Sequence, residues 1–517
     1  MTLAHDEAEV PARPWALLLG LVVAVAAYYA GAWLTYPADV DPFRARRGLA
    51  VTMLVASYWL TGAMPLGAAS LLPLVLFPAL AIQPMSLVAN SYADPILWMF
   101  FGGFVLARAI ERFDLHRRLA LHVIAGVGVR PRRLVLGFIV AATVLSAWIN
   151  NTATALMLMP IGVALVDRIA KDGVLAPQHA RRFSVGVMLG IAYGCSIGGL
   201  ASPIGTPTNL VFFADSNYGA MVKAGAPELS FATWMAVFAP MSAVLALSLW
   251  LMLTRWLHPL PRLASEGAAD AIRGELRALG RMNRAEWRVL LLFLATVTLW
   301  ITRGNMGGVP GWESLVGLPR NHVTDGTVAV GMALLAFVIP SGQPARPTLM
   351  DWRTAASIPW DMYFLLAGGF AIAQSLDGTG LSRALSESLA PVMQGLDPLF
   401  ALAVLIVFTT VLSEIASNTA IASLLMPVLR ATAAAAGLDP RALMLPAVLG
   451  SSFGFAMPIA TPPNAVVFAT GRVSLREMVR AGLVLDAICC AVLVGWCYLV
   501  VFPWLGISFD QVPAWAK

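Results

Sequence analysis

The chain has 517 residues, of which 59% are hydrophobic and only 12% are charged, and its formal net charge is +6. Soluble domains usually carry about 25% charged residues, so this composition excludes a soluble globular protein. The positive balance does not indicate nucleic-acid binding, because the basic residues gather in particular loops, as they do in membrane proteins.

Apolar stretches of roughly 20 residues follow one another, each long enough to cross a hydrocarbon core of about 30 Å. The polar N-terminal segment lacks the basic region and cleavage site of a signal peptide, so we expect the first stretch to remain as a transmembrane helix. The sequence predicts eleven spans, near residues 15–35, 48–62, 65–83, 94–111, 184–216, 232–257, 286–302, 325–340, 359–376, 441–470 and 480–504.

Two further apolar stretches, near residues 134–166 and 397–434, are each interrupted by an uncharged polar triplet. The triplets are Asn150-Asn151-Thr152 and Ser417-Asn418-Thr419. Such breaks suggest re-entrant hairpins, where non-helical backbone is tolerated because it lines a cavity enclosed by protein. The alternative is an ordinary helix with a buried polar patch, and two copies of the break favour the hairpins.

A second motif follows each triplet. Ser202-Pro203-Ile204-Gly205-Thr206-Pro207-Thr208-Asn209 corresponds to Met457-Pro458-Ile459-Ala460-Thr461-Pro462-Pro463-Asn464. Each triplet is also preceded, at almost the same distance, by a glycine pair within 101–104 or 367–370. Paired polar, helix-breaking segments at corresponding places in two halves of a hydrophobic chain point to the binding site of a transporter.

The basic residues predict the orientation in the membrane. They concentrate in segments 108–133, 168–182 and 255–288, and they are sparse in segments 217–232 and 303–324. Basic loops face the cytoplasm, which places the N-terminus inside and, after eleven spans, the C-terminus outside. The helix before the first hairpin then runs inward and its counterpart runs outward, which is an inverted-topology repeat.

The predicted organisation has four parts. They are an N-terminal tail with the first transmembrane helix (1–44), a first inverted repeat (45–258), a cytoplasmic linker (259–285) and a second inverted repeat (286–517). The fold class is therefore an all-α polytopic membrane protein.

The triplets offer neutral oxygen atoms, which hard cations prefer as ligands. Broken helices add free carbonyl groups for cations and free N–H groups for anions. Glu414 is the main charged residue in these segments, and we expect it to hydrogen-bond near the second hairpin. An anion site built from amides, hydroxyls and helix ends avoids burying a fixed positive charge, and it binds an anion well only together with a cation.

These residues resemble the divalent anion:sodium symporter family, which transports dicarboxylates, tricarboxylates and sulfate. The family has two Ser-Asn-Thr motifs at the tips of opposed re-entrant hairpins, each followed by a Gly/Ala-Thr-Pro-Pro-Asn loop in a broken helix. The resemblance extends from about residue 45 to 504. It implies a homodimer with about eleven transmembrane helices per protomer, and a scaffold domain against which a transport domain moves as an elevator.

The resemblance also implies site residues. The first Na⁺ would be bound by Ser146, Asn150, Asn151 and backbone at Gly198 and Gly199, and the second by Ser413, Ala416, Asn418 and Ala460. The substrate would meet Asn151, Thr152, Ser202, Thr206, Ser417, Asn418, Thr419, Thr461 and Pro462. The chain departs from the family pattern at Asn150, where serine is usual, and at Thr208, where proline is common.

The sequence therefore predicts a secondary transporter that couples Na⁺ to movement of a succinate-, malate- or fumarate-like di- or tricarboxylate across the cytoplasmic membrane. A carboxylate exchanger, or a sulfate or H⁺-coupled transporter, is the alternative that Asn150 leaves open. An enzyme is disfavoured because no nucleophile–base pair or metal-ligand cluster is visible at membrane depth. A channel is disfavoured because no charge ring is repeated along a pore.

Overall fold

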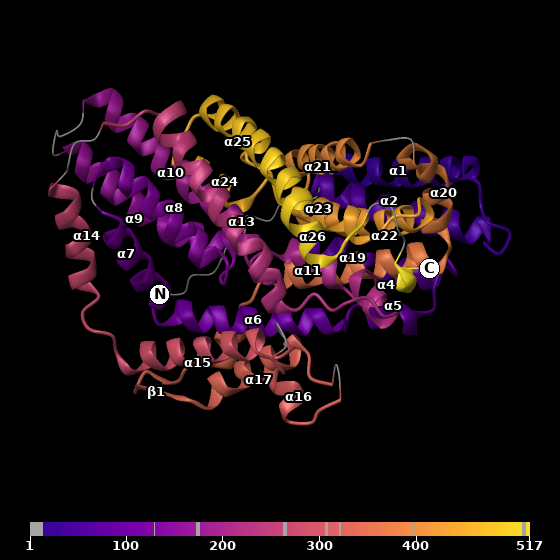
Figure 1. The fold of residues 1–517 in the computed structure, drawn as a ribbon, viewed down its shortest axis with the longest axis horizontal. Coiled ribbons are helices and arrows are strands. Elements are labelled where there is room, and N and C mark those ends of the chain that lie inside the picture. Colours follow the sequence, from indigo (N-terminus) through magenta and orange to yellow (C-terminus); the bar gives the residue numbers. More distant parts are fainter. Residues whose placement is uncertain are drawn as a thin grey trace.

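The computed structural model describes residues 14–128, 130–171, 176–261, 266–305, 309–319, 322–394, 397–508 and 513–516 (Figure 1). Most of these residues are helical, and they contain one small sheet. Most of the predicted N-terminal tail lies outside the described residues.

The first helices lie in the N-terminal part of the described chain. They are α1 (Pro14–Ala30), η1 (Gly31–Trp33), α2 (Pro42–Thr61), α3 (Leu66–Ala69), α4 (Leu72–Ala79), α5 (Met85–Ser91), α6 (Pro95–Arg112) and α7 (Leu115–Val127). The next group contains the first triplet, and it comprises α8 (Pro131–Ser146), α9 (Asn151–Lys171), α10 (Pro177–Gly199), α11 (Pro207–Phe213), α12 (Tyr218–Lys223), α13 (Phe231–Leu251), the π-helix η2 (Met252–Leu257) and α14 (Glu266–Ala278).

A third group precedes the second triplet. It comprises α15 (Arg284–Ile301), α16 (Trp312–Leu315), α17 (Asp325–Val338), the antiparallel strands β1 (Pro340–Gln343) and β2 (Arg346–Thr348), α18 (Trp352–Ala355), α19 (Trp360–Gly378) and α20 (Leu381–Gln394). The last group comprises α21 (Pro398–Ile415), α22 (Asn418–Ala435), α23 (Arg441–Gly450), α24 (Pro462–Ala469), α25 (Leu475–Trp496), the π-helix η3 (Cys497–Val501), α26 (Phe502–Leu505) and η4 (Ala514–Ala516).

Three of the predicted spans are interrupted. The stretch 65–83 divides into α3 and α4, whose second residue is Pro73, because proline lacks the N–H that would continue the preceding turn. The stretches 184–216 and 441–470 each form two helices separated by the second motif. In both, the helix resumes at a proline, Pro207 or Pro462, whose fixed φ suits a first helical position.

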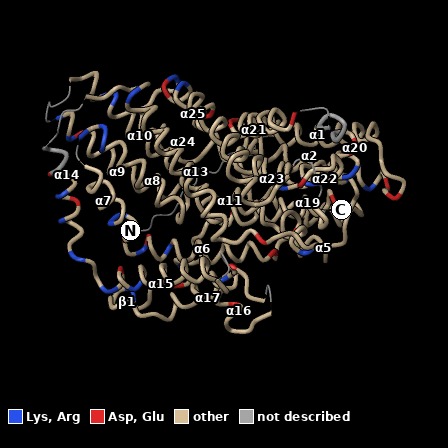
Figure 2. Tube along the Cα trace, viewed as in Figure 1, with Lys and Arg blue, Asp and Glu red and all other residues tan. Residues whose placement is uncertain are grey.

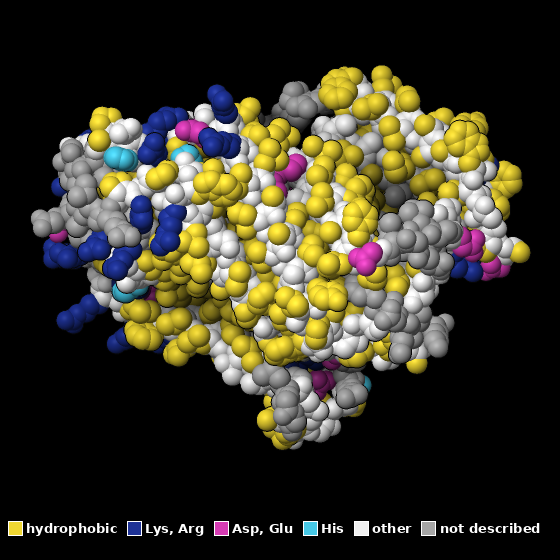
Figure 3. Space-filling view, turned by 45° about the horizontal axis from the view of Figure 1, so that its top comes forward, with side chains coloured by type: hydrophobic (Ala, Val, Ile, Leu, Met, Phe, Trp, Pro, Cys, Tyr) yellow, Lys and Arg dark blue, Asp and Glu magenta, His cyan; other side chains and the backbone are white. Residues whose placement is uncertain are grey.

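Six helices in the described part are long and apolar enough to cross a bilayer: Pro14–Trp33, Met85–Arg112, Asn151–Lys171, Phe231–Leu257, Pro398–Ile415 and Leu475–Leu505. Much of their large apolar surface is uncovered, as in α1, where Leu18 is 63% and Val22 is 64% exposed. Hydrophobic side chains dominate the face drawn in Figure 3, and charged residues are sparse along the middle of the trace in Figure 2. These are the features of a multi-pass membrane protein. The total of eleven spans stays a prediction.

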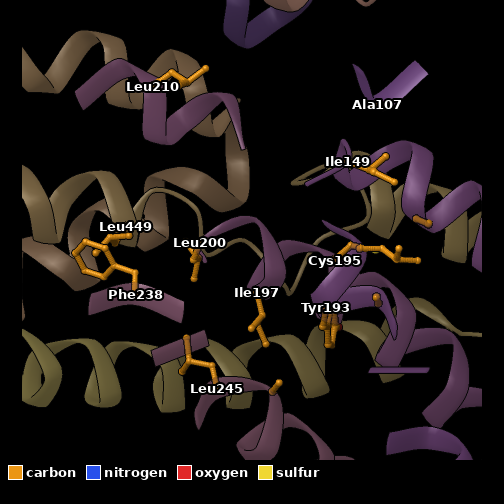
Figure 4. Packing of buried hydrophobic residues seen from close by; sticks show 14 of the residues in the cluster. Ala107, Ile149, Tyr193, Cys195, Ile197, Leu200, Leu210, Phe238, Leu245 and Leu449 are labelled. Carbon is orange, nitrogen blue, oxygen red and sulfur yellow. The ribbon is translucent and has the colours of Figure 1, made fainter. Parts of the chain in front are cut away.

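The two triplets join pairs of helices that occupy different ends of the molecule. The pair α8 and α9 lies at the left of the view and the pair α21 and α22 lies at the right (Figure 1). Helix α10, buried from Phe183 to Gly199, lies in the larger apolar cluster, where Tyr193, Ile197 and Leu200 pack among residues of α13 and α23 (Figure 4). Helix α10 therefore supports the α8–α9 hairpin from inside the apolar core.

Glycines at every fourth position let α8 approach α10 closely. Gly186, Gly190, Gly194 and Gly198 share one face of α10, a small-residue pattern typical of helix contacts in membranes. A Cβ atom at Gly194 would lie 3.1 Å from the Ile139 carbonyl oxygen, and one at Gly198 would overlap the Thr143 backbone. The contact between α8 and α10 becomes closer toward Ser146, and it therefore fixes where α8 ends.

This contact predicts opposite effects of two matched substitutions. Gly198→Ala forces backbone apart and should lower the free energy of unfolding by about 1–3 kcal/mol. Gly186→Ala should be neutral or stabilising by up to about 1 kcal/mol, because its Cβ would meet Val135 at an ordinary 3.5 Å and alanine is the better helix former. Thermal unfolding of the purified protein in sodium-free detergent buffer measures both. Equal shifts in the two variants would contradict the tightening contact.

Candidate functional site

The first hairpin is closed by a contact between two side chains. Ser146, fully buried in the last turn of α8, places its Oγ 2.5 Å from the side-chain amide of Asn151, the first residue of α9. The amide orientation that satisfies its neighbours turns Nδ2 toward Ser146 Oγ, the Gly205 carbonyl at 3.2 Å and the Cys195 carbonyl at 3.3 Å. Asn151 thereby joins the hairpin to the broken helix α10–α11.

The second hairpin is closed by the corresponding serine and asparagine at the same sequence spacing, but here the amide oxygen faces the serine. Ser413 Oγ, fully buried, lies 2.6 Å from Asn418 Oδ1 and 2.7 Å from the Ser451 carbonyl oxygen. The hydroxyl has a single hydrogen and can donate it to only one of these two acceptors. Three oxygen atoms thus share one hydrogen, an arrangement that a cation would stabilise.

The two hairpin tips differ in how the second helix begins. Asn150 Oδ1 accepts a hydrogen bond from the Thr152 backbone N–H at 2.8 Å and so caps the start of α9. Ser417, at the corresponding position before α22, makes no side-chain cap. The asparagine that departs from the family pattern therefore uses its amide oxygen to stabilise the helix.

Each loop of the second motif is held by an asparagine at its end. Both asparagines donate two hydrogen bonds from Nδ2 to carbonyl groups seven and ten residues earlier, which closes the loop into the same shape twice. The bonds run from Asn209 to the Gly199 (2.9 Å) and Ser202 (2.9 Å) carbonyls, and from Asn464 to the Gly454 (3.0 Å) and Met457 (3.1 Å) carbonyls. The threonines before the resumed helices also match, with φ/ψ of −139°/141° at Thr206 and −138°/146° at Thr461.

The loops are tied to the hairpins by different groups. In the first half the Ser202 hydroxyl donates to the Ala147 carbonyl. In the second half the Glu414 carboxylate accepts the backbone N–H groups of Ala456 at 2.8 Å and Met457 at 2.9 Å. Glu414 thus hydrogen-bonds near the second hairpin, as expected, and its side chain orders the loop that leads to α24.

The two halves of the chain contact each other in a matching way. Helix α11 packs against α22, and α24 packs against α9, so each short helix contacts the hairpin of the other half. Thr208 Oγ1 lies 3.3 Å from Thr419 Oγ1 and 3.5 Å from Thr206 Oγ1. A Cβ atom at Gly199 would meet both the Asn151 amide and Thr206. The contacts therefore connect Asn151 to Thr419 through one continuous set of neighbours.

Oxygen atoms without hydrogen bonds gather in these segments. Among the described residues, buried side-chain oxygens lacking a partner include Ser196 Oγ, Asn209 Oδ1, Thr461 Oγ1 and Asn464 Oδ1. The two asparagine oxygens are related by the repeat. In the stretches 146–152, 199–209, 413–419 and 454–464, Glu414 is the only charged residue. The region is rich in neutral oxygen acceptors. Such groups are suited to bind a small free cation rather than to pair with a fixed positive side chain.

The predicted residues lie in and around this region with different exposures. Buried are Ser146, Gly198, Gly199, Ser202, Thr206, Ser413, Thr419, Ala460 and Thr461; half-buried are Asn150, Asn151, Thr152, Ala416, Ser417 and Asn418; Pro462 is exposed. The sequence-based set omitted Asn209, Asn464, Ser196 and the Ser451 carbonyl. Identical placement at the end of the doubled second motif was a signal for the first two.

Residues 15–505 match the family model described as the sodium:sulfate symporter transmembrane region. The chain is 35% identical over 468 residues to the sodium-dependent dicarboxylate transporter SdcS of Staphylococcus saprophyticus, covering 90% of this chain and 87% of that one. It is 33% identical over 499 residues to SdcS of Staphylococcus aureus, covering 96% and 93%. The YdaH transporter of Alcanivorax borkumensis has a similar fold, with a TM-score of 0.56, 15% identity and coverage of 96% and 98%.

Proposed function

This chain belongs to the sodium:sulfate symporter family, and from that premise we propose that it imports a small dicarboxylate together with Na⁺. The names of the SdcS relatives support the dicarboxylate class of substrate. The resemblance to the divalent anion:sodium symporters is thereby confirmed, and the protein is a transporter with Na⁺ as the coupled ion.

One observation carries the proposed site. Each hairpin is closed by a serine and an asparagine five residues apart, Ser146 with Asn151 and Ser413 with Asn418. The contact between Thr208 and Thr419 joins the two halves. A dicarboxylate bound between two such closures would meet matching groups at both of its ends.

We assign two cation sites to the hairpin closures. The first uses Ser146, Asn150, Asn151 and backbone at Gly198 and Gly199, and the second uses Ser413, Ala416, Asn418 and Ala460. The buried hydroxyls, the amide oxygens and the unpaired neutral acceptors support this assignment.

The substrate then lies between the cations. Its carboxylates meet the side-chain amides and hydroxyls at the start of α9 and α22 and at the resumed helices α11 and α24, where the positive end of each helix dipole favours an anion. The proposed contacts are Asn151, Thr152, Thr206, Ser417, Asn418, Thr419, Thr461 and Pro462, with Ser202 supporting the first loop. Because Ser202 donates to Ala147, we give it a role in holding the loop rather than a direct contact.

The negative charge of the substrate explains the proposed coupling to Na⁺. Without lysine or arginine in these segments, the cations supply the positive charge that a dianion needs. Moving one elementary charge across 100 mV costs or releases about 2.3 kcal/mol, so a dianion alone opposes an inside-negative potential by about 4.6 kcal/mol. Two Na⁺ cancel this cost, and a third makes uptake electrogenic.

We further propose the membrane organisation that the repeat favours. Parts 45–258 and 286–517 are inverted repeats with re-entrant hairpins in about eleven transmembrane helices, and the N-terminus is cytoplasmic. The hairpins and broken helices form a transport domain that moves as an elevator against a scaffold in a homodimer. The pair α8 and α9 and the pair α21 and α22 lie at different ends of the molecule, which supports the opposed placement of the two hairpins (Figure 1).

Uptake into proteoliposomes tests the function. Labelled succinate should accumulate under an inward sodium gradient and fail to do so in choline buffer. Unlabelled malate should compete strongly and sulfate weakly, because two matched hairpin closures suit two separated carboxylates. Uptake that is equal in sodium and choline would reject coupling to Na⁺.

Asn150 favours one second candidate, a carboxylate exchanger or an H⁺-coupled or sulfate transporter. Its amide oxygen already accepts the Thr152 N–H, which leaves less capacity for a cation at the first site. Succinate uptake that requires internal dicarboxylate, and not external sodium, would support exchange. The same vesicles loaded with and without succinate distinguish the two functions.

A further inference from the structure

A groove of about 1000 Å³ opens between the end of the α13–η2 helix and the start of α25. Leu257 and His258 form one side, and the first turns of α25, from Leu475 to Leu483, form the other. Both helices are among those long and apolar enough to cross a bilayer, so the groove lies where two such helices end together.

The groove has a positively charged rim. Arg181, Arg182 and Arg480 all act electrostatically on His258, and Glu477 is the acid beside them. Arg181 is ion-paired with Glu477 at 3.0 Å. The side chains of Arg476 and Arg480 are exposed and, within the described part of the chain, form neither an ion pair nor a hydrogen bond. The clustering of basic side chains at this end of the molecule is visible at the left of Figures 2 and 3.

The floor beside that rim is apolar. Leu475 is 49% and Leu483 is 57% exposed on α25, and Trp256, the residue before Leu257 on η2, is 66% exposed. A soluble anion needs the arginines but has no use for an uncovered apolar surface. An anionic phospholipid uses both, because its phosphate pairs with arginine while its acyl chains cover leucine and tryptophan.

We propose that this groove binds an anionic phospholipid, with the phosphate against Arg476 and Arg480 and the acyl chains along the surface that begins at Leu483. The inference does not depend on the transported substrate. It has a structural consequence, because Gly482, beside Leu483, packs so closely on Phe455 and Ala456 that no Cβ would fit. A lipid seated here would brace the helix that supports the loop of the second motif.

Native mass spectrometry of the purified full-length protein tests the proposal. Phosphatidylglycerol should remain bound where phosphatidylcholine dissociates. The double variant R476Q/R480Q should weaken phosphatidylglycerol binding roughly 25-fold, since each basic residue near an anionic headgroup contributes about a factor of five. Leu483→Ser should weaken it several-fold with no change in charge. If the double variant is recovered aggregated, Arg480→Gln alone should give about a fivefold loss.

The matched control is R284Q/R353Q, which removes two arginines from exposed positions on α15 and α18. It should bind phosphatidylglycerol as the unaltered protein does. An equal loss in the control would show unspecific attraction and overturn the proposal. It would also be overturned if inorganic phosphate alone displaced the lipid at millimolar concentration while Leu483→Ser had no effect, because the groove would then be a soluble-anion site.

Discussion

Succinate uptake should fall at least a hundredfold when Asn151 or Asn418 is replaced by alanine, while the folded protein is still recovered. Each asparagine closes its hairpin against a buried serine and is proposed to contact both a cation and the substrate. A hydrogen bond to a charged group contributes about 1.5–3 kcal/mol, and 1.4 kcal/mol is a tenfold change in binding. Losing one such contact to the anion and one ligand of the cation therefore exceeds a hundredfold. Initial uptake rates in proteoliposomes measure the effect.

The control is Asn90→Ala, an asparagine on α5 that is exposed to the surroundings. It removes the same atoms from outside the site and should leave uptake unchanged. Size-exclusion profiles separate loss of transport from loss of folding. Normal uptake by both site variants would refute the assignment of these residues. A loss in only one of them would show that a single hairpin carries the substrate contacts.

The breaks in the helices were predictable because their causes are local. Proline at 207 and 462 lacks an N–H group, and the flanking glycine, threonine and asparagine residues favour turns over helix. The doubling of these signals at equal spacing predicted which segments form the candidate site. The family match extends this to the fold, since residues 15–505 agree with one family model.

The long-range hydrogen bonds that hold the two loops could not be predicted from the sequence. Glu414 holds two N–H groups 42 and 43 residues away, and Ser202 holds a carbonyl 55 residues away. A backbone group carries no sequence signal of its own, so its partner is identified only after folding. The division of 65–83 was missed for another reason, because continuous apolarity hid the effect of Pro73 within a stretch of adequate length.

Glu414 holds its loop with two hydrogen bonds and Ser202 holds its loop with one, and this difference leads to the second prediction. Glu414→Ala should abolish uptake and lower stability by more than Ser202→Ala. Removing the carboxylate leaves the N–H groups of buried Ala456 and half-buried Met457 without their acceptor, and a buried unpaired group costs about 1–3 kcal/mol. The freed loop continues directly to Ala460 and Thr461 of the second proposed site. Ser202→Ala leaves only one carbonyl without its donor.

The two variants form a matched pair because they cut the same connection in each repeat. Thermal unfolding in detergent should show the larger decrease for Glu414→Ala, and the sodium concentration for half-maximal uptake should rise in any residual activity. Ser202→Ala should retain measurable uptake with a modestly higher sodium requirement, since Asn209 still holds its loop through two hydrogen bonds. If Glu414→Ala transported as well as Ser202→Ala, the carboxylate would not be what orders the second loop. Asn464 alone, bonded to the Gly454 and Met457 carbonyls, would then suffice to hold it.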